Sequence, residues 1–329
     1  MSEPIDAVIP WVDGGDPAHR AKLDAYLAGL GRSRPIAADP TRFNDDGELA
    51  YCIASIVRHA PWLRTIHVVT DDQRPGVFDA LRGTPWEHRV KLVDHREIFA
   101  GFEDCLPTFN SRSISCLFWR IPGIAGNHLY LNDDFMLLRP VQPGDFFRDG
   151  RVAIRGQWEA QSHRRWSKRL ARAMGSERQA GHNPTESKAQ DLSARLAGFE
   201  DRCFRLEHCP YPMRSSTFAE FFAAHPGLLR ETVGHRLRDP TQLRPESLAT
   251  HLELASGTAF ADDALKLVHL KPAEQSAWRL RRKLRRADRD PDMAFACVQS
   301  LEKADPEVHA EIIGWLDRRI GRLEDALSA

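Results

Sequence analysis

Two adjacent aspartates near the middle of this 329-residue chain are the residues best suited to chemistry. Asn132-Asp133-Asp134 follows the apolar residues 128–131 and precedes a second apolar run, residues 135–138. Acids between apolar runs need compensation for lost hydration, and a cation provides it. Carboxylate oxygens suit Mg²⁺ or Mn²⁺, ions that are readily shared with substrate phosphates. We therefore expect Asp133 and Asp134 to bind Mg²⁺ or Mn²⁺ in an enzyme that acts on a phosphate-bearing substrate.

Acids also follow two other apolar runs that are expected to be strands. Asp13 comes after residues 5–12, and Asp71-Asp72 comes after the β-branched residues 65–70. In an open α/β sheet ligands bind beyond the carboxyl ends of the strands, so acids that are distant in sequence can converge there. Aspartates at strand ends are also common turn formers and helix caps, and we favour that structural role for Asp71-Asp72.

Short apolar runs alternate with helical patterns over the first 155 residues. We expect strands at 5–12, 65–70, 90–93, 128–131 and 152–155, and helices at 17–30, 47–59 and 111–120. This alternation predicts an α/β fold with a parallel or mixed sheet covered on both faces. The pattern beyond Gly156 is mainly helical and more charged. We expect a core at residues 1–155 and a mainly helical part at residues 156–329, which together form one compact unit.

Charge and cysteine usage exclude several classes of protein. Lys+Arg and Asp+Glu both number 46, so no net field attracts nucleic acid, and we expect no nucleic-acid partner. The six cysteines include no Cys-x-x-Cys pair, which makes disulfides and zinc sites improbable and fits buried thiols in a reducing cytoplasm. His208-Cys209 is the one juxtaposition that suggests a metal, but no second such pair lies nearby in the sequence.

The sequence predicts peripheral membrane contact at most. The N-terminus lacks a basic start followed by an apolar run, and no stretch approaches the roughly 20 apolar residues that span a bilayer. Residues 278–286 (WRLRRKLRR) form a dense basic run. Such a run is typical of a solvated helix face near acidic neighbours, and the alternative is contact with an anionic membrane. We expect a cytoplasmic protein, peripheral at the inner face of a bacterial membrane under that alternative.

Four blocks of the sequence, in order, resemble the conserved blocks of the Stealth proteins. The first is IDAVIPWVDGGDP at 5–17, and the second joins RFNDDGEL at 42–49, HAPWLR at 59–64 and VTDDQ at 69–73. The third joins LPTFNS at 106–111, RIPG at 120–123 and LYLNDDF at 129–135. HCPYP at 208–212 and GHRLR at 234–238 resemble the region that follows. Four long blocks in register are far more specific than a single motif.

This resemblance implies a Rossmann-like fold of the nucleotide-sugar-transferase type, in which the core binds the nucleotide sugar and the metal. Stealth proteins include bacterial capsular-polysaccharide phosphotransferases and the catalytic subunit of the lysosomal-targeting N-acetylglucosamine-1-phosphotransferase. The implied reaction moves a hexose-1-phosphate from a nucleotide sugar, such as UDP-N-acetylhexosamine, to a hydroxyl of a glycan acceptor. It forms a phosphodiester and releases nucleoside monophosphate, in capsule or cell-surface polysaccharide synthesis.

The resemblance also implies catalytic roles for individual residues. Asp13 completes the metal site of Asp133 and Asp134 or orients the donor. Arg236 and Arg238 supply planar forks for phosphate oxygens, although surface arginines are plausible here from the sequence alone. His208 is expected to be the general base for the acceptor hydroxyl, because its ordinary pKa lies near working pH; the alternative is a structural histidine.

Further residues of these blocks are expected to bind the donor. They are Arg42, Asn44, Asp46, Glu48, Asn110, Ser111 and Asn132. Glu48 could equally be a first-turn acid favoured by the helix dipole, and Asn110 and Ser111 could simply cap the following helix.

The sequence departs from the family pattern at two places. Ile114-Ser115 and Trp119 stand where the pattern has Ile-Glu and His, and Gln299-Ser300 stands where Asn-Asp follows a cysteine. Two alternatives to the sugar-1-phosphate transferase therefore stay open. One is a metal-dependent glycosyltransferase that releases nucleoside diphosphate, and the other is a degenerate carbohydrate-binding member.

Overall fold

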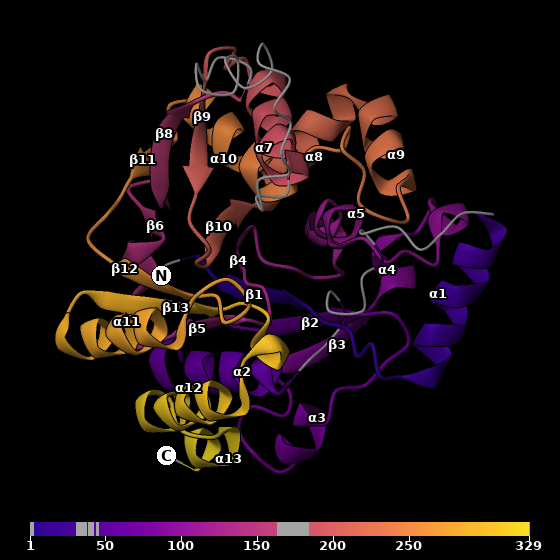
Figure 1. Ribbon diagram of the computed structural model, residues 1–329. Helices are drawn as coiled ribbons and strands as arrows, with labels where there is room; N and C mark the ends of the chain where they lie inside the picture. Colours follow the sequence, from indigo (N-terminus) through magenta and orange to yellow (C-terminus); the bar gives the residue numbers. More distant parts are fainter. Residues whose placement is uncertain (1–2, 31–37, 39–42, 44–45, 163–183, 329) are drawn as a thin grey trace, which may run out of the picture.

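A five-stranded mixed sheet lies at the centre of the molecule (Figure 1). The structure, a computed structural model, describes residues 3–30, 38, 43, 46–162 and 184–328. The strand order is β10-β4-β1-β2-β3, formed by Tyr211–Arg214, Asn127–Tyr130, Ile5–Pro10, Ile66–Thr70 and Val90–Asp94. The last four run parallel, and β10 pairs antiparallel with β4. Because β1 and β2 are covered on both faces, they are almost continuously apolar and buried. The prediction of a Rossmann-like mixed sheet is confirmed.

Three smaller sheets surround the central one. The first has the order β12-β13-β5 (Lys266–Leu270, Met293–Val298, Phe135–Leu137), and the second has the order β11-β7-β6 (Ala259–Ala261, Arg151–Ile154, Phe147–Arg148). The third pairs β8 (Gly156–Ala160) with β9 (Arg202–Leu206). The expected strand at 152–155 is β7, which lies outside the central sheet. Residues after 156 therefore supply β10 to the central sheet, and β12 and β13 to the sheet that contains β5. Helices nevertheless predominate in this part of the chain.

The first half of the chain contributes the following described α-helices. They are α1 (Pro17–Gly29), α2 (Glu48–His59), α3 (Val77–Ala80), α4 (His95–Ile98) and α5 (Ser111–Ser115). Asp16 caps α1, accepting a hydrogen bond from the Ala18 amide at 2.8 Å. The helix expected over 111–120 ends at Ser115, because Leu117 leaves helical geometry and a 3₁₀ turn follows at Phe118–Arg120.

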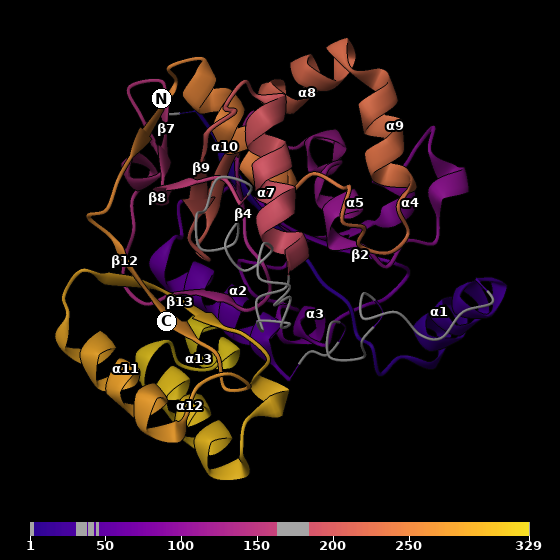
Figure 2. The ribbon, with the colours of Figure 1, turned by 45° about the horizontal axis from the view of Figure 1, so that its top comes forward.

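The helices of the second half form two groups (Figure 2). One group holds α7 (Pro184–Leu196), α8 (Ser215–Ala224), α9 (Pro226–Gly234) and α10 (Pro245–Ala255). The other holds α11 (Ala277–Arg289), α12 (Pro306–Arg319) and α13 (Leu323–Leu327), with α13 packed against α2. None of the described helices is long and apolar enough to cross a membrane.

A buried carboxylate holds together the loops that precede the central strands. Asp6, on β1, is fully buried and accepts hydrogen bonds from Arg64 Nε (2.8 Å), Arg64 Nη2 (2.6 Å) and the Ala125 amide (2.8 Å). His67 Nε2 lies 3.1 Å from the same carboxylate. Burial alone would raise the pKa of Asp6, but the bonds from His67 and Arg64 outweigh it and hold that pKa well below its usual range.

Replacing this carboxylate should be costly, because it leaves buried donors without their acceptor. We expect Asp6→Asn to lower the free energy of unfolding by about 3 kcal/mol. Asp104→Asn removes the exposed pair with Arg230 and should cost less than about 1 kcal/mol. Urea denaturation measures both, and equal losses would contradict the role of Asp6.

The same substitution predicts a pH dependence. The pKa of Asp6 is lower in the native state than in the unfolded state, where it is about 4. The ionised carboxylate therefore stabilises the fold fully above about pH 4, and this stabilisation is lost as the pH falls from about 4 towards the native pKa. The difference in stability between wild type and Asp6→Asn should therefore shrink in acid.

Candidate active site

Asn132-Asp133-Asp134 forms the turn between β4 and β5, at the carboxyl edge of the central sheet. Asp134 Oδ2 accepts a hydrogen bond from the Cys297 thiol at 3.5 Å, whereas its Oδ1 is buried and has no hydrogen-bond partner among the described residues. Burial raises the pKa of Asp134 to about 7, against the opposing effect of the Cys297 bond. A buried carboxylate oxygen without a partner fits a cation, so Asp133 and Asp134 are suited to hold one.

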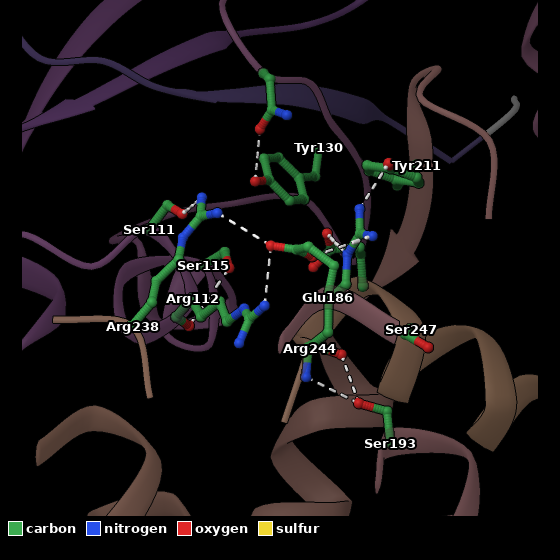
Figure 3. A network of polar contacts seen from close by, with 12 residues as sticks. Ser111, Arg112, Ser115, Tyr130, Glu186, Ser193, Tyr211, Arg238, Arg244 and Ser247 are labelled. Atoms are coloured by element: carbon green, nitrogen blue, oxygen red, sulfur yellow. Dashed lines mark hydrogen bonds and ion pairs between the residues drawn. The ribbon is translucent and has the colours of Figure 1, made fainter. Parts of the chain in front are cut away.

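Three arginines converge on the carboxylate of Glu186, at the start of α7 (Figure 3). Arg112 Nη2 and Arg238 Nη1 lie 3.0 and 3.1 Å from Glu186 Oε1, and Arg244 Nη1 lies 3.7 Å from Oε2. Arg244 also donates to Glu246 at 2.5 Å. We call these five residues the arginine cluster. Its three cations exceed its two anions by one charge, so it can attract a further anion.

Two arginines of the cluster are buried, which strengthens their electrostatic interactions because water screens them poorly. Arg112 is 4% and Arg244 is 6% exposed. Burial alone would raise the pKa of Glu186, but Arg244, Arg112 and Arg238 outweigh it and lower that pKa to about 2. Neither terminal nitrogen of Arg112 makes a hydrogen bond of good geometry within the described part of the chain. The cluster therefore keeps donors for phosphate oxygens, which guanidinium groups bind in pairs.

Two tyrosines connect the arginine cluster to the acids. Tyr130 donates to Asn132 Oδ1 at 2.7 Å, and its ring centre lies 5.6 Å from that of Tyr211. The Tyr211 hydroxyl accepts a hydrogen bond from Arg244 at 3.1 Å (Figure 3). These contacts join the arginine cluster to Asn132, the residue that precedes the two acids.

His208 lies in the turn between β9 and β10, at the edge of this site. Its ring centre is 4.7 Å from that of His269 and 6.3 Å from that of Phe135. Burial, together with the positive charges of Arg244, His269 and Lys271, lowers the pKa of His208 to about 3. The imidazole is therefore neutral at pH 7 and a weak base.

The structure separates the two arginines that the sequence pairs. Arg238 joins the cluster and donates to Ser111 Oγ at 2.7 Å, which places Ser111 in the site as well. Arg236 instead donates to the Asp104 carbonyl at 2.9 Å and lies over the Tyr26 ring. Arg236 thus lies apart from Arg238, the other predicted phosphate ligand.

Other predicted residues have structural partners. Asp13 lies in an exposed turn, where its Oδ1 accepts from the Gly15 amide at 2.6 Å. Asp46 Oδ2 lies 2.5 Å from His309 Nε2 of α12. Glu48 begins α2 and accepts from the Asp46 amide at 2.5 Å, as the first-turn alternative predicts. Donor contacts by these residues stay predictions.

Asn110 caps α5, as its capping alternative predicts. It accepts from the Arg112 amide at 3.1 Å and donates to the His235 carbonyl and to Gln242, both at 2.9 Å. Its position fixes Arg112 and the segment that carries Arg238. The remaining predicted donor ligands, Arg42 and Asn44, lie outside the described residues.

Sequence reasoning missed Arg112, Glu186 and Arg244. Arg112 directly follows the Asn110-Ser111 motif, which is the one signal that could have identified it. Arg244-Pro245-Glu246 has the sequence of an ordinary helix start, and Glu186 lies in a charged stretch without a motif. Their convergence depends on tertiary packing.

These features define an α/β protein with a candidate site that combines acids suited to a cation with arginines suited to a phosphate-bearing anion. Residues 3–31 match conserved region 1 of the Stealth proteins, and residues 42–154 match conserved region 2. The chain belongs to the Stealth family.

Several polysaccharide phosphotransferases are similar to this chain in sequence. The chain is 34% identical over 261 residues to an exopolysaccharide phosphotransferase of Streptomyces coelicolor, covering 79% of this chain and 42% of the relative. It is 36% identical over 150 residues to a capsular polysaccharide phosphotransferase of Actinobacillus pleuropneumoniae, covering 45% and 40%. The chain thus spans about two fifths of these relatives' lengths.

Solved glycosyltransferases resemble the overall fold at low identity. The galactosyltransferase LgtC, with donor and acceptor sugar analogues, aligns at a TM-score of 0.42 and 11% identity, covering 95% of this chain and 96% of its own. Mouse xyloside xylosyltransferase 1 aligns at a TM-score of 0.39 and 13% identity, covering 84% and 89%.

The separation of Arg238 from Arg236 predicts unequal effects on anion binding. Arg238→Ala should weaken the binding of inorganic pyrophosphate by roughly 10- to 100-fold, because a hydrogen bond between charged groups is lost. Arg236→Ala, a matched loss of one charge, should change the affinity by less than about threefold. Isothermal titration calorimetry measures both, and equal effects would contradict the assignment.

Proposed function

We propose that this chain transfers a hexose-1-phosphate from a nucleotide sugar, such as UDP-N-acetylhexosamine, to a hydroxyl of a glycan acceptor. The observation that carries the proposal is the convergence of Arg112, Arg238 and Arg244 on Glu186. Tyr211 and Tyr130 connect this cluster to Asn132, the residue before Asp133 and Asp134. The names of the relatives, exopolysaccharide and capsular polysaccharide phosphotransferases, support a role in capsule or exopolysaccharide synthesis.

The arginine cluster suits the charge changes of this reaction. The acceptor oxygen forms a bond to the phosphorus that bears the sugar, and the bond from that phosphorus to the bridging oxygen breaks. Nucleoside monophosphate leaves with the bridging oxygen and its electron pair, and the acceptor proton passes to a base. Such transfer requires neutralisation and alignment of phosphate oxygens, which fixed guanidinium groups provide.

Asp133 and Asp134 would hold the Mg²⁺ or Mn²⁺ ion. The buried, unpartnered Asp134 Oδ1 fits this role, since a nearby cation favours the ionised carboxylate. A bound cation supplies further neutralisation of the pyrophosphate charge.

The acceptor proton passes to a base, and the position of His208 makes it the expected one. His208 stays the predicted base, but a base with a pKa of about 3 accepts a proton weakly at neutral pH. The neutral imidazole fits a hydrogen-bond acceptor or a metal ligand better.

A donor screen tests the reaction through its nucleotide product. Incubation with nucleotide sugars and Mg²⁺ or Mn²⁺ should release nucleoside monophosphate, measured by chromatography. Asp133→Ala should reduce this release by about a hundredfold or more, because cation binding is lost. Arg82→Ala, which alters an exposed ion pair with Asp79, is the control and should retain activity.

Other outcomes of the screen distinguish the alternatives. Release of nucleoside diphosphate without a phosphodiester product would indicate a glycosyltransferase. Binding of glycans without turnover of any donor would indicate a carbohydrate-binding member.

The basic helix α11 supports a second proposal, peripheral contact with an anionic membrane. Arg281 pairs with Glu307 and Glu311 of α12 at 2.8 and 2.6 Å, as the solvated-face alternative predicts. The outward face carries an exposed tryptophan and arginines that make no ion pair with described residues: Trp278 (61% exposed), Arg279, Arg282, Arg285 and Arg289. An amphipathic tryptophan among arginines suits an anionic lipid surface.

Charge reversal on α11 tests this contact. Arg282→Glu/Arg285→Glu should reduce co-sedimentation with phosphatidylserine vesicles about tenfold or more, because each basic residue contributes about 1 kcal/mol. Arg82→Glu/Lys91→Glu makes the same charge change on exposed residues elsewhere and should retain binding. Donor turnover should be normal in both variants, and unchanged vesicle binding by the α11 variant would defeat the idea.

A further inference from the structure

Strand register places a histidine beside a cysteine at the edge of the candidate active site. β12 and β13 pair in parallel, with His269 opposite Cys297, and β13 pairs antiparallel with β5, with Cys297 opposite Phe135. Residues that face each other on neighbouring strands direct their side chains to the same side of a sheet. His208 reaches this row from the turn between β9 and β10 and lies against both His269 and Phe135.

The donor atoms in this row lie close together. The ligand atoms of His208, His269 and Cys297 all lie within 4.8 Å of one another. Asp134 Oδ2 lies 3.5 Å from Cys297 Sγ. Zinc bonds of about 2.0–2.3 Å in a tetrahedron separate ligand atoms by roughly 3.3–3.8 Å, so small side-chain movements could close the set around one ion.

We propose that His208, His269 and Cys297 bind a transition-metal ion of the Zn²⁺ type. Two imidazoles and a thiolate are ligands that Zn²⁺ prefers, with a fourth position open to water or substrate, whereas Mg²⁺ takes oxygen ligands. Asp134 stays available for the hard cation of the proposed function. An imidazole bound to this ion does not accept the acceptor proton, so a metal-bound His208 is not the general base. In every other respect the metal site is independent of hexose-1-phosphate transfer.

The surroundings of these side chains suit a metal site. Cys297 is fully buried on a strand that is paired on both sides, so its position is rigid. Gln299 Oε1 lies 3.3 Å from His269 Nε2 and can orient that ring, as outer-shell partners of metal-binding histidines do. Gln299 is also one of the residues at which the sequence departs from the Stealth pattern.

An ion can reach this site from solvent. His208 and His269 line an open cavity of about 610 Å³, whose lining also includes Lys283 of α11. An entry path of this kind is one requirement of a metal site that loads after folding.

Cobalt substitution tests the proposal without any turnover. Addition of Co²⁺ to the metal-free full chain should produce tetrahedral visible bands and a thiolate-to-cobalt charge-transfer band, saturating at one ion per chain. Excess Mg²⁺ should not displace the ion, because Mg²⁺ does not favour nitrogen and sulfur ligands. A wild-type chain without the charge-transfer band would overturn the proposal, whatever the variants do.

Variants assign the ligands. Cys297→Ser should abolish the charge-transfer band, and His269→Gln should weaken Co²⁺ binding by about tenfold or more. Cys105→Ser is the matched control, because Cys105 is also buried but lies near Arg230, and it should keep the band. Persistence of the band in Cys297→Ser, with circular dichroism confirming the fold, would overturn the assignment.

The cobalt experiment and the donor screen test the metal proposal and the proposed function separately. A cobalt site with no release of nucleoside monophosphate would leave the metal proposal intact and would remove the phosphotransferase proposal. Phosphotransfer with Mg²⁺ by a chain that shows no charge-transfer band would support the phosphotransferase proposal and overturn the metal proposal.

Discussion

The structure of this protein depends on the neutralisation of its buried charges. Asp6 is ionised inside the protein only because Arg64 and His67 meet it there, and this contact secures the loops that enter β2 and β4. Glu186 is likewise ionised because arginines surround it. An ionised group in a low-dielectric interior is stable only with such partners. Asp134 Oδ1 is the contrasting case, since it is buried without a hydrogen-bond partner in the described chain, and it lies where the ends of β4 and β13 meet.

Much of the fold could be predicted from the sequence, because buried parallel strands are continuous apolar runs. The predicted ranges 5–12, 65–70, 90–93 and 128–131 each overlap a strand of the central sheet. The strand β13, an apolar run that is buried at every position, was overlooked because it follows the highly charged α11. The turn after β4 was identifiable, since paired acids between apolar runs are a local signal.

The anion-binding half of the site was only partly predictable, because it is assembled from segments distant in sequence. Arg112 comes from α5, Glu186 from α7 and Arg244 from the segment before α10. Arg236 and Arg238 are two residues apart, but the chain bends at Arg236 and Leu237, so the two guanidinium groups reach different neighbours. The sequence also does not predict the row formed by His208, His269 and Cys297. Strand register, rather than sequence spacing, brings these residues together.

Glu186 explains how three arginines can be positioned in advance of a substrate. Guanidinium groups at this separation repel one another, and burial increases the repulsion because the surroundings screen it poorly. A carboxylate at their centre offsets that repulsion and fixes the donors in place, so little reorganisation is needed when an anion binds. A pyrophosphate group carries more negative charge than one carboxylate and offers more acceptor oxygens, so it could compete with Glu186 for the same nitrogens. The carboxylate therefore acts as an internal counter-ion, which holds the arginine cluster in shape and sets the affinity that any phosphate ligand of this cluster would have to exceed.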